Sequence, residues 1–199
     1  MNIEKYQHSG ILPKWHEKEF KDFVNDPVTL KKILRYIDKA DTNLKKGVGL
    51  YLYGSNGRGK TLLMNLSFKA FLEKGYTVKI ISLSSLITKF VAGWYSPEEK
   101  RDLQRTLCTV DFLGIEELGK EFRSKESDLG VMVFDNILRL RVQSNLPIWI
   151  TSNTPPNEIS EKYSIGISSM LLESCVEVPV NGEDFRKAIH ELNVREFKA

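Results

Sequence analysis

One short segment has the composition and spacing of a phosphate-binding loop. It reads Gly54-Ser55-Asn56-Gly57-Arg58-Gly59-Lys60-Thr61, followed by Leu62. Each required position of G-x-x-x-x-G-K-[ST] is matched. Glycines let successive N–H groups point at one anion, and a following helix directs its positive end to the same place. The segment therefore predicts a site for ATP and Mg²⁺, with residues 54–62 at the nucleotide, Lys60 at the β- and γ-phosphates and Thr61 at the metal. A glycine turn without a ligand is the alternative.

Two adjacent carboxylates, Glu116 and Glu117, follow an apolar segment at residues 110–115 that we expect to be a strand. Hydrolysis of ATP needs one carboxylate for magnesium and another for the attacking water, both at the carboxyl end of a strand beside the loop. We predict that Glu116 binds magnesium and that Glu117 orients the water, whereas Asp111 lies at the wrong end of the strand. Glu116 departs from the aspartate usual at that position. The alternative is that both glutamates begin a solvated loop.

A polar residue, Asn153, follows the expected strand at residues 147–152. An amide there can hydrogen-bond the γ-phosphate and the attacking water, which makes Asn153 a candidate nucleotide sensor. The segment Ser-Asn-Thr-Pro-Pro also has the composition of a turn, so a turn residue without a role in nucleotide sensing remains an equal alternative for Asn153.

Apolar periodicity predicts the elements that position these residues. Strands are expected at residues 49–53, 76–83, 110–115, 147–152 and 176–180. Helices are expected after Asp26-Pro27 and at residues 62–74, 84–93, 97–107 and 131–144. Such alternation predicts an α/β fold: a three-layer sandwich around a mostly parallel five-stranded sheet, without a separate lid domain. We expect an N-terminal leader at residues 1–25 and one ATPase domain at residues 26–199.

Bulk composition is that of a soluble globular protein. The chain has 199 residues, of which 41% are apolar and 28% charged. No apolar run approaches the roughly 20 residues of a membrane helix and no secretory signal begins the chain, so we predict a cytoplasmic protein without a membrane partner. Cys108 and Cys175 lack metal-ligand spacing and are expected to be buried thiols. The net charge of +3 fits an anionic partner without identifying one.

The order of several motifs resembles a known group, the DnaC- and DnaI-type helicase loaders and IstB-type transposition helpers of the AAA+ class. The markers are Ser9-Gly10-Ile11, Phe20 and Phe23, the phosphate loop, residues 110–119, Thr151-Ser152-Asn153 and residues 182–186. The resemblance implies the AAA+ fold, ATP-dependent assembly with a possible homo-oligomer, and loading of a replicative hexameric helicase on single-stranded DNA. It also assigns Asn153 to the first sensor position. An IstB-like helper and a nucleotide-binding scaffold with little turnover remain alternatives.

In these relatives the segment between the second strand and the acidic strand contacts single-stranded DNA. It corresponds to residues 84–105 and carries Lys89, Phe90, Trp94, Tyr95, Lys100, Arg101 and Arg105. Aromatic rings can stack on unpaired bases and cations can neutralise phosphates, so this composition suits single strands. A solvated helix face with aromatic residues in the core is the alternative.

The family's arginine finger is missing from its expected place. Met170 occupies that position, and residues 165–167 lack a second arginine common in relatives. Such an arginine contributes about 10³- to 10⁵-fold in rate, so the resemblance implies weak intrinsic hydrolysis. Arg186 is the best remaining arginine to contact nucleotide, with a surface ion pair as the alternative. Arg123 and Arg139 are weaker candidates.

Overall fold

Five parallel strands form the centre of the molecule. The computed structural model describes residues 3–92, 96–119 and 127–186, together with residues 190, 194, 195 and 197. The strands are β1 (Gly49–Tyr53), β2 (Val78–Ser82), β3 (Phe112–Leu118), β4 (Ile148–Ser152) and β5 (Cys175–Pro179). Their order is β2-β3-β4-β1-β5, and every neighbouring pair is parallel. The predicted five-stranded sheet is confirmed. All five carboxyl ends therefore meet at one edge.

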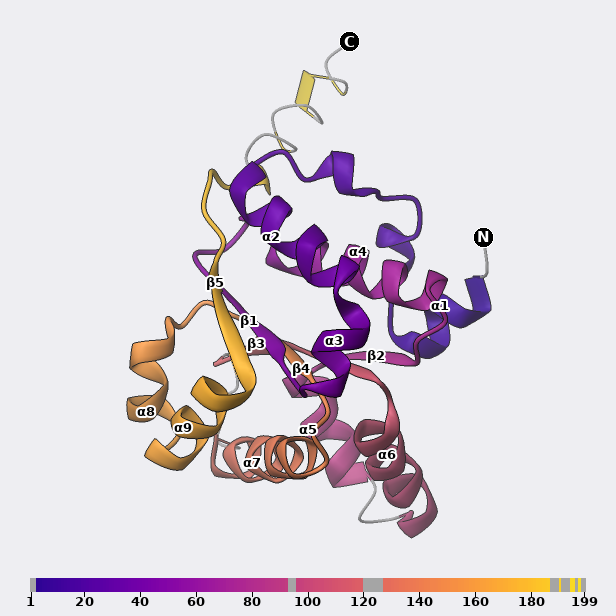
Figure 1. Ribbon diagram of the computed structural model, residues 1–199, viewed down its shortest axis with the longest axis vertical. Helices are drawn as coiled ribbons and strands as arrows, with labels where there is room; N and C mark the ends of the chain where they lie inside the picture. Colours follow the sequence, from indigo (N-terminus) through magenta and orange to yellow (C-terminus); the bar gives the residue numbers. More distant parts are fainter. Residues whose placement is uncertain are drawn as a thin grey trace.

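Helices cover both faces of the sheet (Figure 1). They are α1 (Ile3–Ser9), α2 (Pro27–Asp38), α3 (Ala40–Lys45), α4 (Lys60–Glu73), α5 (Leu83–Ala92), α6 (Pro97–Thr109), α7 (Ser127–Gln143), α8 (Ile159–Lys162) and α9 (Ile165–Ser174). One hydrophobic cluster joins α1, α2 and α4 to the sheet, and a second joins α5, α7 and α9 to its opposite face. Alternate residues of β1 serve the two clusters, as the two-residue period of a strand requires. The three-layer prediction is confirmed.

Several element boundaries differ from the sequence prediction. β3 continues to Leu118, so Glu116 and Glu117 belong to the strand and do not follow it. The helix expected at residues 131–144 begins already at Ser127. Helices α8 and α9 occupy a region that the apolar pattern left unassigned. Of the two cysteines, Cys175 is buried whereas Cys108 is half-buried, so the buried-thiol prediction holds fully only for Cys175.

Close packing fixes α4, the helix that follows the phosphate loop. A side chain at Gly114 of β3 would lie 2.9 Å from the Met64 sulfur and 3.1 Å from the Phe68 ring, so the glycine lets α4 approach the sheet. Further along α4, the Phe71 ring stacks on Phe112 with 4.0 Å between centroids. These contacts hold the middle and the last turn of α4 against β3.

Residues 3–25 pack on the same core as the rest of the chain. Tyr6, Ile11 and Phe23 are buried in the first hydrophobic cluster. The Lys69 ammonium donates to the carbonyls of Trp15 (3.2 Å), His16 (2.6 Å) and Lys18 (2.7 Å). These contacts place the segment against α4, while the domain division at residue 25 stays a prediction.

The amino-terminal edge of the sheet is held by a buried arginine on α7. Arg141 has no exposed surface. Its guanidinium donates to four backbone carbonyls, those of Leu107 (2.8 Å), Val110 (3.0 Å), Asp111 (3.1 Å) and Pro147 (2.7 Å). Burial lowers the pKa of Arg141 to about 10, so it remains charged near neutral pH. One side chain thus ties together the segments that lead into β3 and β4.

No helix in the described part of the chain combines the length and apolar character needed to cross a bilayer.

Candidate nucleotide site

The phosphate loop joins the end of β1 to the first turn of α4. Gly54, Gly57 and Gly59 all have positive φ, at 145°, 75° and 90°. All three also meet close neighbours: a Cβ would lie 2.5 Å from the Val180 carbonyl oxygen at Gly54, 1.6 Å from Oδ1 of Asp184 at Gly57, and 2.8 Å from the Phe23 ring at Gly59. Both the backbone conformation and the packing therefore require glycine at these three positions.

Lys60, the first residue of α4, is only 9% exposed and directs its ammonium back into the loop. Nζ donates to the carbonyls of Gly54 (2.6 Å) and Ser55 (2.8 Å) and to Oδ1 of Asn153 (2.9 Å). Each of the three ammonium protons thus has an acceptor. The fold thus brings Lys60 and Asn153, 93 residues apart in sequence, into contact.

The Asn153 amide connects Lys60 to Asn56 of the phosphate loop. Its Oδ1 accepts from Lys60, and its Nδ2 donates to Oδ1 of Asn56 at 2.9 Å. Because an ammonium can only donate, the oxygen of Asn153 must face Lys60 and its NH₂ must face Asn56. The end of β4 is therefore linked to the loop at two points.

The side chain of Asn65 connects Thr61 to Glu116. Asn65 is 1% exposed and lies one helical turn after Thr61. Its Nδ2 donates to the Thr61 carbonyl (2.8 Å) and lies 3.4 Å from Oε1 of Glu116. Asn65 is not among the residues predicted from the sequence, although a polar residue four positions after the threonine in an apolar helix was a usable signal.

This donor set fits magnesium. A hydroxyl and a carboxylate are hard oxygen ligands, and magnesium is commonly held by one or two protein groups with phosphates and water. Oδ1 of Asn65 is buried without a hydrogen-bond partner among the described atoms, so it can accept from a metal-bound water. Thr61 and Glu116 are thus the residues that would hold the ion.

Glu117 is placed by an irregularity at the end of β3. Its φ of 65° is left-handed, and the register between β3 and β4 shifts between Ile115 and Leu118. The Glu117 N–H donates to Oγ1 of Thr151 at 3.1 Å. Such bulges re-aim side chains beside functional sites, and here the Glu117 side chain is exposed at the carboxyl edge. Asp111 lies at the opposite end of the strand, as expected.

The segment after β5 contacts the loop from the other side. The Phe185 N–H donates to the Gly57 carbonyl (3.2 Å), and Asn25 Nδ2 donates to the Glu183 carbonyl (2.8 Å). Arg186 directly follows Phe185, and its exposed side chain extends from a segment that is hydrogen-bonded to the phosphate loop. Its contact with nucleotide stays a prediction, and Arg123 lies outside the described residues.

The residues proposed for DNA lie away from the loop, on α5 and α6. Lys89, Arg101 and Arg105 are exposed, but Arg105 pairs with Asp102 at 2.9 Å. Phe90 is half-buried and packs against the second hydrophobic cluster. Trp94, Tyr95 and the side chain of Lys100 lie outside what the structure describes.

A parallel sheet in the order β2-β3-β4-β1-β5, with the phosphate loop between β1 and α4, defines the P-loop fold of the AAA+ class. No family model matches the chain. In sequence it is similar to the replicative helicase loader DnaI of Bacillus subtilis (strain 168), with 26% identity over 147 residues. That match covers 71% of this chain and 45% of DnaI, so the chain spans less than half of the relative.

Solved structures with the same fold include replication proteins. The DnaC helicase loader superposes with a TM-score of 0.74 at 18% identity, covering 85% of this chain and 100% of that one. A DnaI structure gives 0.68 at 20% identity, covering 87% and 93%. The replication initiator DnaA, bound to AMPPCP and single-stranded DNA, gives 0.70 at 17% identity, covering 94% and 56%. The resemblance to DnaC- and DnaI-type loaders is therefore confirmed in sequence and fold.

Proposed function

We propose that this chain binds ATP with magnesium and uses it to load or remodel a replicative hexameric helicase on single-stranded DNA, in the cytoplasm. The observation that carries the proposal is the contact between Lys60 and Asn153 across a complete phosphate loop. The similarity to the helicase loader DnaI supports the choice of partner.

ATP binding follows from an exchange of hydrogen-bond partners. The Lys60 ammonium gives up one or more of its present acceptors for β- and γ-phosphate oxygens, while the N–H groups of the loop and the first turn of α4 surround the phosphates. The binding set is Gly54, Ser55, Asn56, Gly57, Arg58, Gly59, Lys60, Thr61 and Leu62, with Arg186 at its margin. Magnesium, when bound at Thr61 and Glu116, supplies charge neutralisation on the phosphates.

Hydrolysis uses the polar ends of β3 and β4. Glu117 accepts a hydrogen bond from the attacking water, and the Asn153 amide contacts the γ-phosphate once Lys60 has turned to the nucleotide. Met170 stands where relatives supply an arginine to a neighbouring subunit. Intrinsic turnover is therefore slow, and self-association would raise it only if another cation enters the site.

The partners are the helicase and single-stranded DNA, the latter contacted by Lys89, Phe90, Lys100, Arg101 and Arg105. A transposition helper of IstB type uses the same chemistry with a transposase as its client. The client that the chain retains in the presence of ATP, a helicase or a transposase, distinguishes the two functions.

The test measures phosphate release by the purified chain alone, with single-stranded DNA, and with its cognate helicase, alongside helicase–DNA complex formation in each nucleotide state. ATP-dependent helicase recruitment that is lost in Lys60→Ala is expected. The matched control, Lys74→Ala, removes an exposed lysine just after α4 and should recruit normally. Normal recruitment by Lys60→Ala would contradict the proposal, and retention of a transposase instead would select the alternative.

A further inference from the structure

The segment at residues 27–46, which comprises α2, α3 and the residue that follows each, carries a positive charge larger than that of the whole chain. Residues 27–46 contain six cations: Lys31, Lys32, Arg35, Lys39, Lys45 and Lys46. They contain two carboxylates, Asp38 and Asp41, which leaves a net charge of +4. Because the whole chain has a net charge of +3, the remaining residues together carry −1. The basic character of the protein is therefore concentrated in this one segment, the α2–α3 face.

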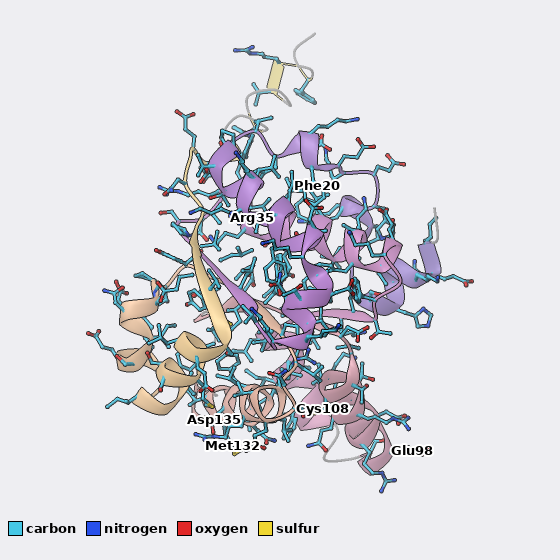
Figure 2. All side chains as sticks on the ribbon, in the orientation of Figure 1. Phe20, Arg35, Glu98, Cys108, Met132 and Asp135 are labelled. Carbon is cyan, nitrogen blue, oxygen red and sulfur yellow. The ribbon has the colours of Figure 1, made fainter. Side chains whose placement is uncertain are left out.

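All six cations point to solvent. The apolar side of α2 is buried, with Ile33, Tyr36 and Ile37 in the first hydrophobic cluster, whereas every one of the cations is exposed. Lys31 and Arg35 are four residues apart and so lie on one side of α2, and Lys39 directly follows the last residue of the helix. Figure 1 shows α2 and α3 as consecutive helices on the outside of the sheet, and Figure 2 labels Arg35 on α2.

These charges are not compensated within the described part of the chain. No described carboxylate lies within ion-pair distance of any of the six, whereas cations elsewhere are paired, as in Lys21–Glu19, Arg105–Asp102 and Arg139–Asp135. Like charges four residues apart, as Lys31 and Arg35 are, slightly destabilise a helix, and a bound anion would relieve that repulsion. The α2–α3 face therefore suits an anionic partner.

We propose that the α2–α3 face binds the phosphate backbone of duplex DNA without reading its sequence. Backbone contacts need only cations, and each neutralised phosphate releases counterions. Single-strand binding normally adds aromatic rings for base stacking, and Tyr36, the one aromatic residue between positions 27 and 46, is buried with its hydroxyl bonded to the Val48 carbonyl.

Other anionic partners fit the face less well. Insertion into an anionic membrane surface requires an extended exposed apolar side. The apolar side of α2 packs on the core, and of its large apolar residues only Val28 and Leu34 are exposed. A protein interface normally has aromatic anchors at its centre, and no exposed aromatic residue occurs on α2 or α3.

The spacing also matches a duplex backbone. At 1.5 Å per residue, Lys31 to Lys39 spans about 12 Å along the helix, which corresponds to three or four phosphates of one strand at about 3.4 Å along the duplex axis. Duplex binding by the α2–α3 face is independent of the proposed helicase-loading function, because it involves neither the phosphate loop nor α5 and α6.

The experiment measures the affinity of the full chain for a fluorescent duplex of mixed sequence between about 50 and 200 mM salt. Lys31→Gln/Arg35→Gln should lower the affinity by on the order of tenfold or more at the lowest salt. It should also reduce the slope of log K against log salt by about 1.8, because two phosphate contacts are lost. Lys31→Arg/Arg35→Lys keeps both charges and should restore the slope.

The matched control, Lys14→Gln/Lys74→Gln, removes two exposed cations outside α2 and α3 that also lie beyond ion-pair distance of any described carboxylate, and it should leave the slope unchanged. Thermal unfolding of each variant verifies that the fold is intact. An unchanged slope in Lys31→Gln/Arg35→Gln would overturn the proposal. A loss confined to single-stranded oligonucleotides, with duplex binding intact, would overturn the assignment to duplex DNA.

Discussion

Two buried cations lie at opposite ends of the same sheet, and their partners differ in kind. At the amino-terminal edge, Arg141 donates to four backbone carbonyls. At the carboxyl edge, Lys60 donates to two loop carbonyls and to the side chain of Asn153. The partners of Arg141 cannot leave without moving the backbone, whereas the Asn153 amide can turn away when a phosphate arrives. The buried charge of Arg141 therefore has a structural role, whereas the buried charge of Lys60 can exchange a hydrogen-bond partner for a phosphate.

The backbone around the two cations supports the same contrast. Beside Lys60, β3 has a register shift and Glu117 has a left-handed φ of 65°. Left-handed conformations cost a non-glycine residue on the order of 1–3 kcal/mol when strained, and they gather at functional sites. At the other end, Asp111 simply accepts from the N–H and hydroxyl of Thr77, at 2.7 and 2.8 Å.

The largest expected effect is the loss of stability in Arg141→Leu. Four buried carbonyls lose their donor, so the free energy of unfolding should fall by about 3 kcal/mol or more. Denaturant unfolding measures the change. Arg139→Leu is the matched control, two residues away on the same helix. Its ion pair with Asp135 is partly exposed, so its removal should cost at most about 1 kcal/mol. Equal losses in the two variants would remove the structural role given to Arg141.

Hydrolysis should depend on the carboxylate of Glu117. Glu117→Gln keeps the size and backbone of the residue but weakens the hydrogen bond to water, so turnover should fall by about 10²-fold or more. Nucleotide affinity, measured on the same preparation, should stay within about twofold, because the change acts on the transition state. If turnover were unchanged, another residue would have to orient the water.

Lys60→Ala should lower the ATP affinity and leave the stability almost unchanged, the opposite of Arg141→Leu. A charge-assisted hydrogen bond to phosphate is lost, so ATP affinity should fall by about 10- to 100-fold. The free energy of unfolding should change little, since the two loop carbonyls and Asn153 lie at a partly open edge. Calorimetric titration and denaturant unfolding give both values. A large loss of stability with intact ATP binding would make Lys60 structural as well.

Asn65 should have the smallest effect of the four, on magnesium alone. Asn65→Ala removes the link between Thr61 and Glu116, and such outer contacts typically change metal affinity by about 10- to 100-fold. We expect the magnesium concentration for half-maximal nucleotide binding to rise by about tenfold, with metal-free nucleotide binding unchanged. Titration with magnesium at fixed ATP separates the two, and an unaltered magnesium dependence would exclude Asn65 from the metal site.

Much of the candidate site could be predicted because its signals are local in sequence. The phosphate loop is eight consecutive residues whose roles follow from glycine conformation and the next helix. The helix expected after Asp26-Pro27 is α2, and Asp26 caps it by accepting from the Thr29 N–H at 2.9 Å. The predicted end of β3 was too early. Glu116 and Glu117 are charged and lower the strand propensity, but β3 still pairs with β4 at Leu118.

Hydrophobic period and motif spacing are properties of neighbouring residues, so the amino-acid pattern was enough to predict the parallel sheet, the loop and the polar residues at the carboxyl edge. Which distant groups meet depends on how the whole chain folds. The fold brought Asn153 to Lys60, Asn65 to Glu116 and the arginine at position 141, rather than Arg139, into the core. A buried polar group is satisfied by whatever the fold places beside it, and no local pattern records that choice.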